Sequence, residues 1–330
     1  MTSPRSASKT EQEKSANWTA RPERGSRFML RLMLWLSRRL GRSVSRVILA
    51  GISLYFLLFV PKARRASRDY LQRVLGRSPG WRDLYRHVHT FASTVHDRVY
   101  LLDDRFDLFD IEVVDNGLLK PGQGMVLIGA HFGSFEVIRA ISRQQVGFRV
   151  SMLMYPENAR KINEILSIVN PEAVSDIIAL GEIESMLTAQ ERIASGHLVG
   201  MLADRTLRQD STRDCRFLGA PASFALGPFR MAALLRCPVV FMTGIYEGKN
   251  RYTVHFKPLA DFTDLARSER AAAIADAQDR YVAILADFCR SRPYNWFNFF
   301  DFWSNDNGSS AESDRRAPGK STEHPEELPR

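Results

Sequence analysis

The sequence has few cysteines, and their arrangement excludes two classes of protein. Cys215, Cys237 and Cys289 are an odd number, lie far apart, and form no CxxC or Cys/His metal-ligand spacing. Neither a disulfide framework nor a zinc site is therefore expected, and a reducing compartment fits best. With 330 residues, of which 45% are apolar, the chain has enough material for a core without covalent cross-links.

An excess of basic over acidic residues is confined to one segment, and no nucleic-acid-binding motif or internal repeat occurs. The net charge is +9, but residues 21–68 hold twelve basic residues and one acidic residue, Glu23, so the remainder is slightly acidic. Because this basic segment is interleaved with large apolar runs, it is typical of a chain that lies against anionic lipid headgroups. We therefore expect a membrane as partner and no nucleic acid.

A hydrophobic run long enough for a plain membrane crossing is also missing. Residues 28–40 place arginines among apolar clusters at helical spacing, which predicts a helix in the membrane interface. The apolar run 47–60 has fourteen residues, about 21 Å as a helix, whereas the hydrocarbon core is about 30 Å thick. We expect an embedded or strongly tilted anchor, with a buried core helix as the alternative. Basic residues on both sides of the run favour the membrane.

The rest of the chain divides into segments of different composition. Residues 1–25, a basic arm, and residues 305–330, a tail, are predicted to be disordered because they have little to bury. Residues 26–103 are predicted to form the membrane-anchoring and helical region. In residues 104–304 short apolar runs alternate with helical stretches. This alternation predicts an α/β catalytic domain with a mixed, largely parallel sheet flanked by helices.

One segment combines the features of a catalytic site. In GMVLIGAHFGSFEVIR, residues 124–139, a buried strand ends at His131, and a turn at Gly133 and Ser134 opens a helix that carries Glu136. Strand ends are where α/β enzymes place their chemistry. The turn can bring the Glu136 carboxylate to one ring nitrogen of His131, which leaves the other nitrogen to act as a general base. The spacing alone can arise by chance, and it is the strand, turn and helix around it that favour catalysis.

Other residues of reactive type are expected to have no catalytic part. Ser134 does not lie in a GxSxG turn, so a serine nucleophile is not expected. His87, His89 and His96 lie on one predicted helix without carboxylate partners at metal-ligand spacing, which favours packing over metal binding. The aromatic run 294–303 is interpreted as core packing or an interfacial belt.

The segment AHFGSFE resembles the His-x4-Asp/Glu (HX4E) motif of the lysophospholipid acyltransferase superfamily, and its surroundings are similar to the bacterial lipid A biosynthesis acyltransferase branch. Supporting matches are the basic N-terminal segment, MLADR at 201–205, FLGAPASFALGP at 217–228 and PYNWFNFFDFW at 293–303. Together with RRASRDYLQRVLG and DRVYLL, they are similar to predicted acyltransferases that accompany aryl-polyene and related lipid-tail biosynthesis in Gram-negative bacteria.

The resemblance implies a membrane-associated O-acyltransferase in which His131, oriented by Glu136, deprotonates an acceptor hydroxyl that attacks an acyl thioester. Its second matched segment supplies Asp204 and Arg205, at a predicted strand end, as substrate-binding candidates. The arginine could stabilise the oxyanion or bind phosphate of the donor or acceptor, with a structural salt bridge as the alternative. Gly219 and Gly227 would frame the acceptor loop. ALGP replaces a Pro-Glu-Gly-Thr type of sequence in this loop, which disfavours a simple glycerol phosphate as acceptor.

The implied donor is an acyl-carrier protein or coenzyme A thioester, and the implied acceptor is a lipid or glycolipid. No metal and no bound cofactor are expected, because a thioester is already activated. The expected location is the cytoplasmic face of a bacterial inner membrane. Two alternatives are a membrane-associated acyl thioesterase, in which His131 activates water, and a non-catalytic lipid-binding assembly partner.

Overall fold

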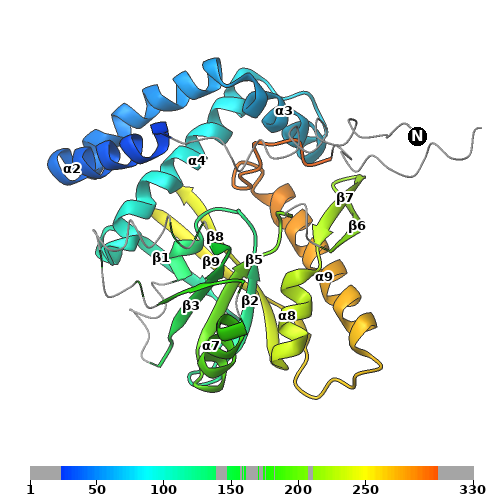
Figure 1. Ribbon diagram of the computed structural model, residues 1–330. Coiled ribbons are helices and arrows are strands. Elements are labelled where there is room, and N and C mark those ends of the chain that lie inside the picture. Colours follow the sequence, from blue (N-terminus) through cyan, green and yellow to red (C-terminus); the bar gives the residue numbers. More distant parts are fainter. Residues whose placement is uncertain are drawn as a thin grey trace, which may run out of the picture.

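A seven-stranded sheet lies at the centre of the computed structural model. The structure describes residues 24–138, 147–156, 158, 160, 170, 174, 176–181, 183–206 and 211–303, with the backbone alone for 24–38, 40 and 183. The predicted tail and residues 1–23 of the predicted arm lie outside these residues, whereas residues 24 and 25 already belong to a helix. Figure 1 shows the strands at the centre of the molecule with helices around them.

The sheet is mixed and mostly parallel, as predicted. Its strands are β1 (Asp110–Val114), β2 (Met125–Gly129), β3 (Val150–Met154), β4 (Ile177–Ala179), β5 (Leu198–Leu202), β8 (Pro238–Gly248) and β9 (Arg251–Asp261). They lie in the order β1-β9-β8-β2-β5-β3-β4, and only β8 and β9 pair antiparallel. Every residue of β2 is buried, because a central parallel strand is covered on both faces. A separate hairpin, β6 (Thr212–Phe217) and β7 (Ala220–Ala225), packs beside the last helix.

Helices cover both faces of the sheet. They are α2 (Arg24–Phe59), α3 (Pro61–Leu75), α4 (Trp81–Leu102), α7 (Ile183–Ala194), α8 (Gly227–Leu235) and α9 (Arg270–Ser291), with short 3-10 turns η1 (Phe106–Leu108) and η2 (Phe135–Val137). Val126 and Ile128 of β2 pack into one apolar core with α8 and α9, and Met125 and Leu127 into another with the end of α4. The alternation of side chains along a strand therefore produces two cores, one on each face.

The N-terminal helices form a layer of their own at one side of the molecule (Figure 1). Gly41 interrupts α2 with φ 73°, a left-handed conformation that glycine adopts without a Cβ penalty. The two predicted apolar segments, 28–40 and 47–60, thus fall on separate helical pieces. By length and composition alone, the piece Gly41–Phe59, with 19 residues, could cross a membrane. The expectation that no segment is long enough for a crossing is therefore wrong, because the helix begins before the fourteen-residue run 47–60.

A buried carboxylate holds α2 to the rest of the protein. Asp97, a fully buried residue of α4, accepts two hydrogen bonds from the Arg42 guanidinium, at 2.9 and 3.0 Å. The Tyr252 hydroxyl, from β9, donates a third at 3.0 Å. A buried charge is tolerated only when it is paired and hydrogen-bonded, so this cluster requires helix α2, helix α4 and the sheet to be in place together.

Replacing Asp97 by alanine should strongly destabilise the protein. The change leaves the Arg42 guanidinium and the Tyr252 hydroxyl without their buried acceptor, which should lower the free energy of unfolding by about 3–5 kcal/mol. Chemical denaturation in detergent measures the change. Asp69→Ala is the control, because it removes the half-exposed pair of Asp69 with Arg73 and should cost less than about 1 kcal/mol. Equal losses of unfolding free energy in the two variants would contradict the role of Asp97 as the buried carboxylate that holds α2 in place.

Candidate active site

His131 lies just beyond the carboxyl end of the central strand β2, where the sequence predicts it. The turn that follows it passes so close to β8 that a Cβ on Gly133 would lie 1.9 Å from the Gly244 carbonyl oxygen. Gly133 also has a left-handed φ of 65°, so both the space and the conformation require glycine. The Ser134 amide donates to the same Gly244 carbonyl at 2.8 Å. The loop that carries His131 is therefore fastened to β8.

The neighbouring strand β5 brings Asp204 to His131. The two strands pair in parallel with Gly129 opposite Leu202, so His131 and Asp204 each follow two residues beyond a paired position. The His131 Nδ1 atom is 2.8 Å from Asp204 Oδ1, and the His131 backbone N–H donates to Oδ2 at 3.0 Å. Asp204 is buried, while 31% of the His131 side chain is exposed. The pair thus has a hidden carboxylate and an accessible ring.

The predicted contact between Glu136 and His131 is wrong. Asp204, and not Glu136, accepts the hydrogen bond from the His131 ring. Glu136 lies in the 3-10 turn η2, where it forms an ion pair with Arg98 of α4 and accepts a hydrogen bond from the Ser134 hydroxyl at 3.2 Å. The turn directs the carboxylate of Glu136 toward α4, whereas the register of β5 places Asp204 next to the ring.

The charge of Asp204 determines which nitrogen of His131 is free. Burial raises the pKa of the Asp204 carboxyl, but the neighbouring His131 and Arg205 and the hydrogen bonds from His131 outweigh it and lower this pKa to about 2. An ionised carboxylate only accepts hydrogen bonds, so Nδ1 of His131 must carry its proton. The Nε2 atom of the neutral ring is then without a proton and can act as a base.

Arg205 also lies at this strand end, with its side chain exposed to solvent. Its guanidinium donates to the Phe297 carbonyl at 3.3 Å and lies over the Phe300 ring, 5.6 Å from the centroid. These two contacts use few of the five N–H donors of an arginine. An anion that entered beside His131 could therefore still be bound by Arg205.

The two predicted glycines lie on other elements. Gly219, with φ 91°, occupies the tight turn between β6 and β7, and Gly227 is the first residue of α8. The hairpin reaches the site indirectly, since Phe217 packs against Trp296 with the ring centroids 5.2 Å apart. The structure brings His131, Asp204 and Arg205 together, and the role of the two glycines stays a prediction.

The C-terminal segment supplies contacts that the sequence interpretation missed. The Asn295 carbonyl accepts from the Gly133 amide, and the Phe297 amide donates to the His131 carbonyl, both at 2.8 Å. The Trp296 indole N–H donates to Asp204 Oδ2 at 3.0 Å. The signal was present in the sequence, because a tryptophan buried in an aromatic run must find an acceptor for its indole N–H.

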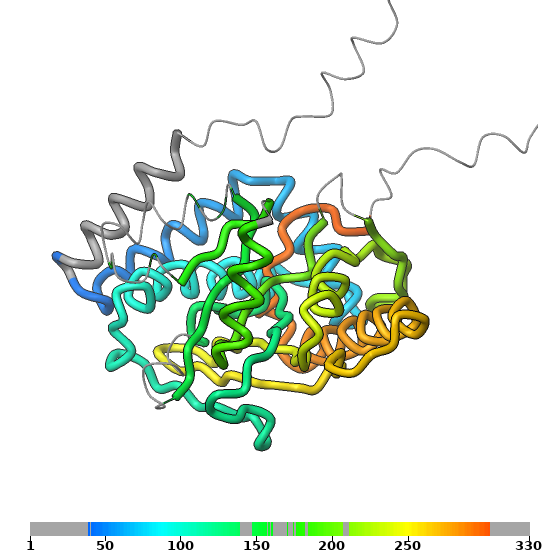
Figure 2. The backbone as a smooth tube through the Cα atoms, turned by 60° about the horizontal axis from the view of Figure 1, so that its bottom comes forward, coloured from blue at the N-terminus to red at the C-terminus, as the bar shows by residue number. Residues whose placement is uncertain are grey.

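His87 holds this segment from the side of helix α4. Its Nε2 is 2.8 Å from the Trp296 carbonyl and its Nδ1 is 2.8 Å from the Ser67 hydroxyl. A carbonyl can only accept, so Nε2 carries the proton and Nδ1 accepts from Ser67. Burial lowers the pKa of His87 to about 4, against the opposing effect of its hydrogen bond to Trp296. His87 is thus a neutral residue of the core. Figures 1 and 2 show that the segment after α9 lies beside α3, the helix that carries Ser67.

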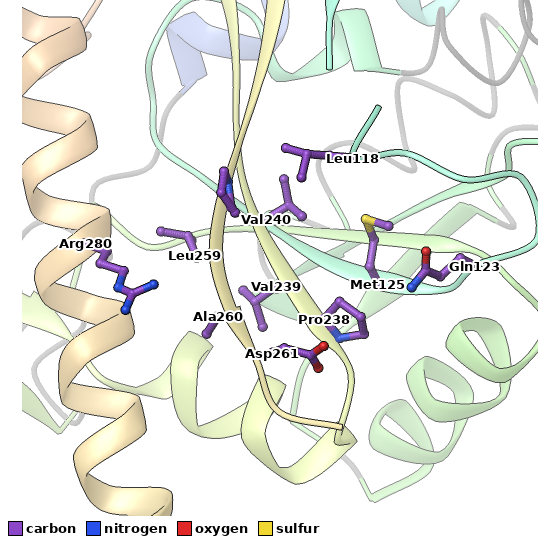
Figure 3. A pocket seen from close by; sticks show the side chains of 11 residues that line it. Leu118, Gln123, Met125, Pro238, Val239, Val240, Leu259, Ala260, Asp261 and Arg280 are labelled. Carbon is purple, nitrogen blue, oxygen red and sulfur yellow. The ribbon is translucent and has the colours of Figure 1, made fainter. Parts of the chain in front are cut away.

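A cavity of about 330 Å³ lies elsewhere, among the first residues of β2 and β8 and the last residues of β9 (Figure 3). Met125, Pro238 and Asp261 line it, together with Arg280 of α9. None of the six predicted site residues lines this cavity. Because His131 follows the opposite end of β2, this cavity is separate from the His131 site.

One comparison with known proteins, with protein-family models, identifies a family. Residues 87–304 match the family model described as bacterial lipid A biosynthesis acyltransferase. No curated protein matches the chain. Among solved structures, the crystal structure of the 1-acyl-sn-glycerophosphate (LPA) acyltransferase PlsC from Thermotoga maritima is similar, with 16% sequence identity and a TM-score of 0.35, over 73% of this chain and 96% of that chain. The range matched by the family model contains all six predicted site residues.

The stability of the protein should depend on His87 in mildly acidic solution. The unfolded chain takes up a proton on this residue below pH 6.5, and the folded protein only near pH 4. The free energy of unfolding should therefore fall by about 3 kcal/mol as the pH falls through this window. In His87→Gln this part of the decline should be missing. Denaturant titrations at several pH values measure it.

His89→Gln is the matched control for that experiment. His89 lies on the same helix and burial also lowers its pKa, but its ring is only half-buried. This variant should keep most of the decline. A wild-type slope in His87→Gln would contradict the assignment of His87 as a neutral residue in the folded protein.

Proposed function

The chain belongs to the bacterial lipid A biosynthesis acyltransferase family, and on that basis we propose that it transfers a fatty acyl group from a thioester to a hydroxyl of a lipid or glycolipid, with His131 as general base. Family membership makes the chain an acyltransferase of lipid biosynthesis. The observation that carries the finer proposal is the hydrogen bond of His131 Nδ1 to the buried carboxylate of Asp204. It leaves Nε2, on a partly exposed ring, for the substrate.

In the proposed reaction one proton moves from the acceptor hydroxyl to His131 and then to the leaving thiol. His131 Nε2 takes the proton of the acceptor hydroxyl, and the oxygen attacks the carbonyl carbon of the thioester. The tetrahedral intermediate collapses, the carbon–sulfur bond breaks, and the thiol leaves with the proton that His131 returns. While it holds the proton, His131 is positively charged. The ionised Asp204 stabilises this charge, as the aspartate of a catalytic His–Asp pair does.

The roles of the remaining candidates follow from their contacts. Asp204 is proposed to orient His131 and not to bind substrate, because it is buried and its contacts are with His131 and Trp296. Arg205 is proposed to stabilise the oxyanion or to bind a phosphate of the donor or acceptor, since its contacts with described residues use few of its five N–H donors. Glu136 is proposed to hold Arg98 of α4 against the turn that follows His131.

The donor and the acceptor are proposed from the charge and the resemblance. An acyl-carrier protein, acidic in the families that this chain resembles, would be attracted by the basic segment 21–68. Coenzyme A thioesters are the alternative donors. The similarity to acyltransferases of aryl-polyene clusters makes a lipid of that type the first acceptor to test. A thioester is already activated, so the proposed step needs no metal and no bound cofactor.

Substitution of His131 should abolish the transfer. We expect His131→Ala to lower the rate by about 10²–10⁴-fold, the range in which a general base acts. Asp204→Asn should lower it by up to about 10⁴-fold, because the amide no longer stabilises the charged ring. Mass spectrometry of lipids from the native host should then show one acylated lipid missing and its precursor accumulating.

Assays with purified enzyme separate the possible results. Glu136→Gln is the matched control, and it should cost less than Asp204→Asn, since Glu136 does not contact the ring of His131. Normal turnover of His131→Ala would contradict the mechanism. Release of free fatty acid at the same rate with and without an acceptor would identify a thioesterase instead.

The exposed face of α2 supports binding of the protein to a membrane surface. Its large apolar side chains form one stripe along the helix, with up to 75% of a residue exposed, at Val44, Val47, Ile48, Leu54, Tyr55, Leu58 and Phe59. The opposite face, with Leu49, Ser53 and Leu57, is buried in the protein. A helix that is fixed to its own domain by Arg42 and Asp97 can insert this stripe into one leaflet without crossing the bilayer. We propose that the bilayer is the bacterial inner membrane, at its cytoplasmic face.

Polar residues in the stripe should weaken membrane binding. The triple variant Val47→Ser, Tyr55→Ser and Phe59→Ser should bind vesicles that contain phosphatidylglycerol at least about tenfold more weakly, because each side chain loses apolar area that the lipid would bury. Flotation of protein with vesicles measures the binding. Leu187→Ser with Leu234→Ser is the control, since both leucines are more than half exposed on other helices. Equal losses of vesicle binding in the two variants would contradict the proposal that the exposed stripe of α2 binds the membrane.

A further inference from the structure

The buried Asp204 carboxylate has one described hydrogen-bond donor from outside residue 131. Two of its three donors are the backbone N–H and the ring of His131 itself. The third is the indole N–H of Trp296, 3.0 Å from Oδ2. A carboxylate that is held only by the group it is meant to orient could turn with that group. The Trp296 bond ties it instead to a separate part of the chain.

The Trp296 ring is held rigidly enough to serve as a fixed point. It is fully buried, and four aromatic rings surround it, with centroids 4.9–6.1 Å away, from Tyr70, Phe217, Phe302 and Trp303. The backbone carbonyl of Trp296 accepts a hydrogen bond from the His87 ring. The residues on both sides are bound as well, since the Asn295 side chain pairs with the backbone of Tyr246 in β8 and the Phe297 amide binds the His131 carbonyl.

From these contacts we infer that Trp296 is a positioning residue of the active site, whose indole N–H fixes the Asp204 carboxylate so that Oδ1 faces His131 Nδ1. The bond on Oδ2 fixes the plane of the carboxylate and leaves Oδ1 for the ring. The ring then keeps its Nδ1 proton, and its Nε2 keeps its direction toward the substrate. The inference rests on the proposed role of His131 as general base and adds to it a residue of the aromatic run near the C-terminus.

The same bond gives the aromatic run a second purpose. Packing alone does not need an N–H group at position 296, because the four surrounding rings contact the indole in T-shaped arrangements. The N–H group instead points at the one buried carboxylate beside His131, where a hydrogen bond to a charged acceptor is stronger than one between neutral groups. The protein can thus be tested for loss of this group with the aromatic packing kept.

The experiment compares Trp296→Phe with Trp303→Phe. Trp303 belongs to the same aromatic cluster, but its indole N–H donates to the Phe217 carbonyl at 3.4 Å. We expect Trp296→Phe to lower kcat by about 10–100-fold with little change in KM, the scale on which outer hydrogen-bond partners act at metal-binding histidines. Trp303→Phe should stay within about threefold of the wild type, a change clearly smaller than that range. Equal losses in the two variants would overturn the inference.

A double-mutant cycle shows whether Trp296 acts through Asp204. In the Asp204→Asn background, Trp296→Phe should cause no further loss of kcat, since the carboxylate on which it acts is gone. The low-field Nδ1–H resonance of His131 should shift or broaden in Trp296→Phe and stay in place in Trp303→Phe. A loss of the same factor in both backgrounds, or an unchanged resonance, would show that Trp296 serves packing alone.

The outcomes separate this inference from the proposed function. Activity retained in His131→Ala would overturn the proposed function. Activity lost in His131→Ala but equal in Trp296→Phe and Trp303→Phe would overturn only the role of Trp296. Should Trp296→Phe fail to fold, 3-benzothienylalanine at position 296 keeps the shape of the indole with sulfur in place of the N–H. The same 10–100-fold loss of kcat is then expected, and wild-type kcat would contradict the inference.

Discussion

The candidate active site depends on one buried negative charge, the carboxylate of Asp204. A charge that is removed from water needs several hydrogen-bond donors to be tolerated. Here the donors come from His131, which follows β2, and from Trp296, near the end of the described chain. Satisfying this carboxylate therefore requires β2, β5 and the C-terminal segment to meet at one point. The same requirement orients the ring of His131, which links the stability of the fold to its proposed chemistry.

A second buried carboxylate, Asp97, acts in the same way on the N-terminal layer. It binds Arg42 of α2 and Tyr252 of β9, so that the helix lies along the domain with one face buried. The stripe on the other face is then directed outward. This ion pair therefore sets the position of the proposed membrane contact relative to the sheet.

The sequence predicted the fold class and the position of His131 well, because both depend on local patterns. Short apolar runs that alternate with helical stretches are visible without a partner, and the Gly133 turn follows the strand directly. It predicted the wrong carboxylate for His131. Glu136 is five residues away in the chain, whereas Asp204 is 73 residues away and lies nearer only because β5 pairs with β2. Sequence spacing contains no information on which strands pair.

By itself the sequence determined which segments are apolar, where they break, and which residues could carry a proton or an anion. It also determined that His131 stands at a strand end and that a basic, apolar segment precedes the domain. The tertiary structure decided which of these groups meet. It paired His131 with Asp204, Glu136 with Arg98, and Trp296 with Asp204. The reason is physical: each buried polar group must find a partner, and the partner that it finds depends on how distant strands and helices pack.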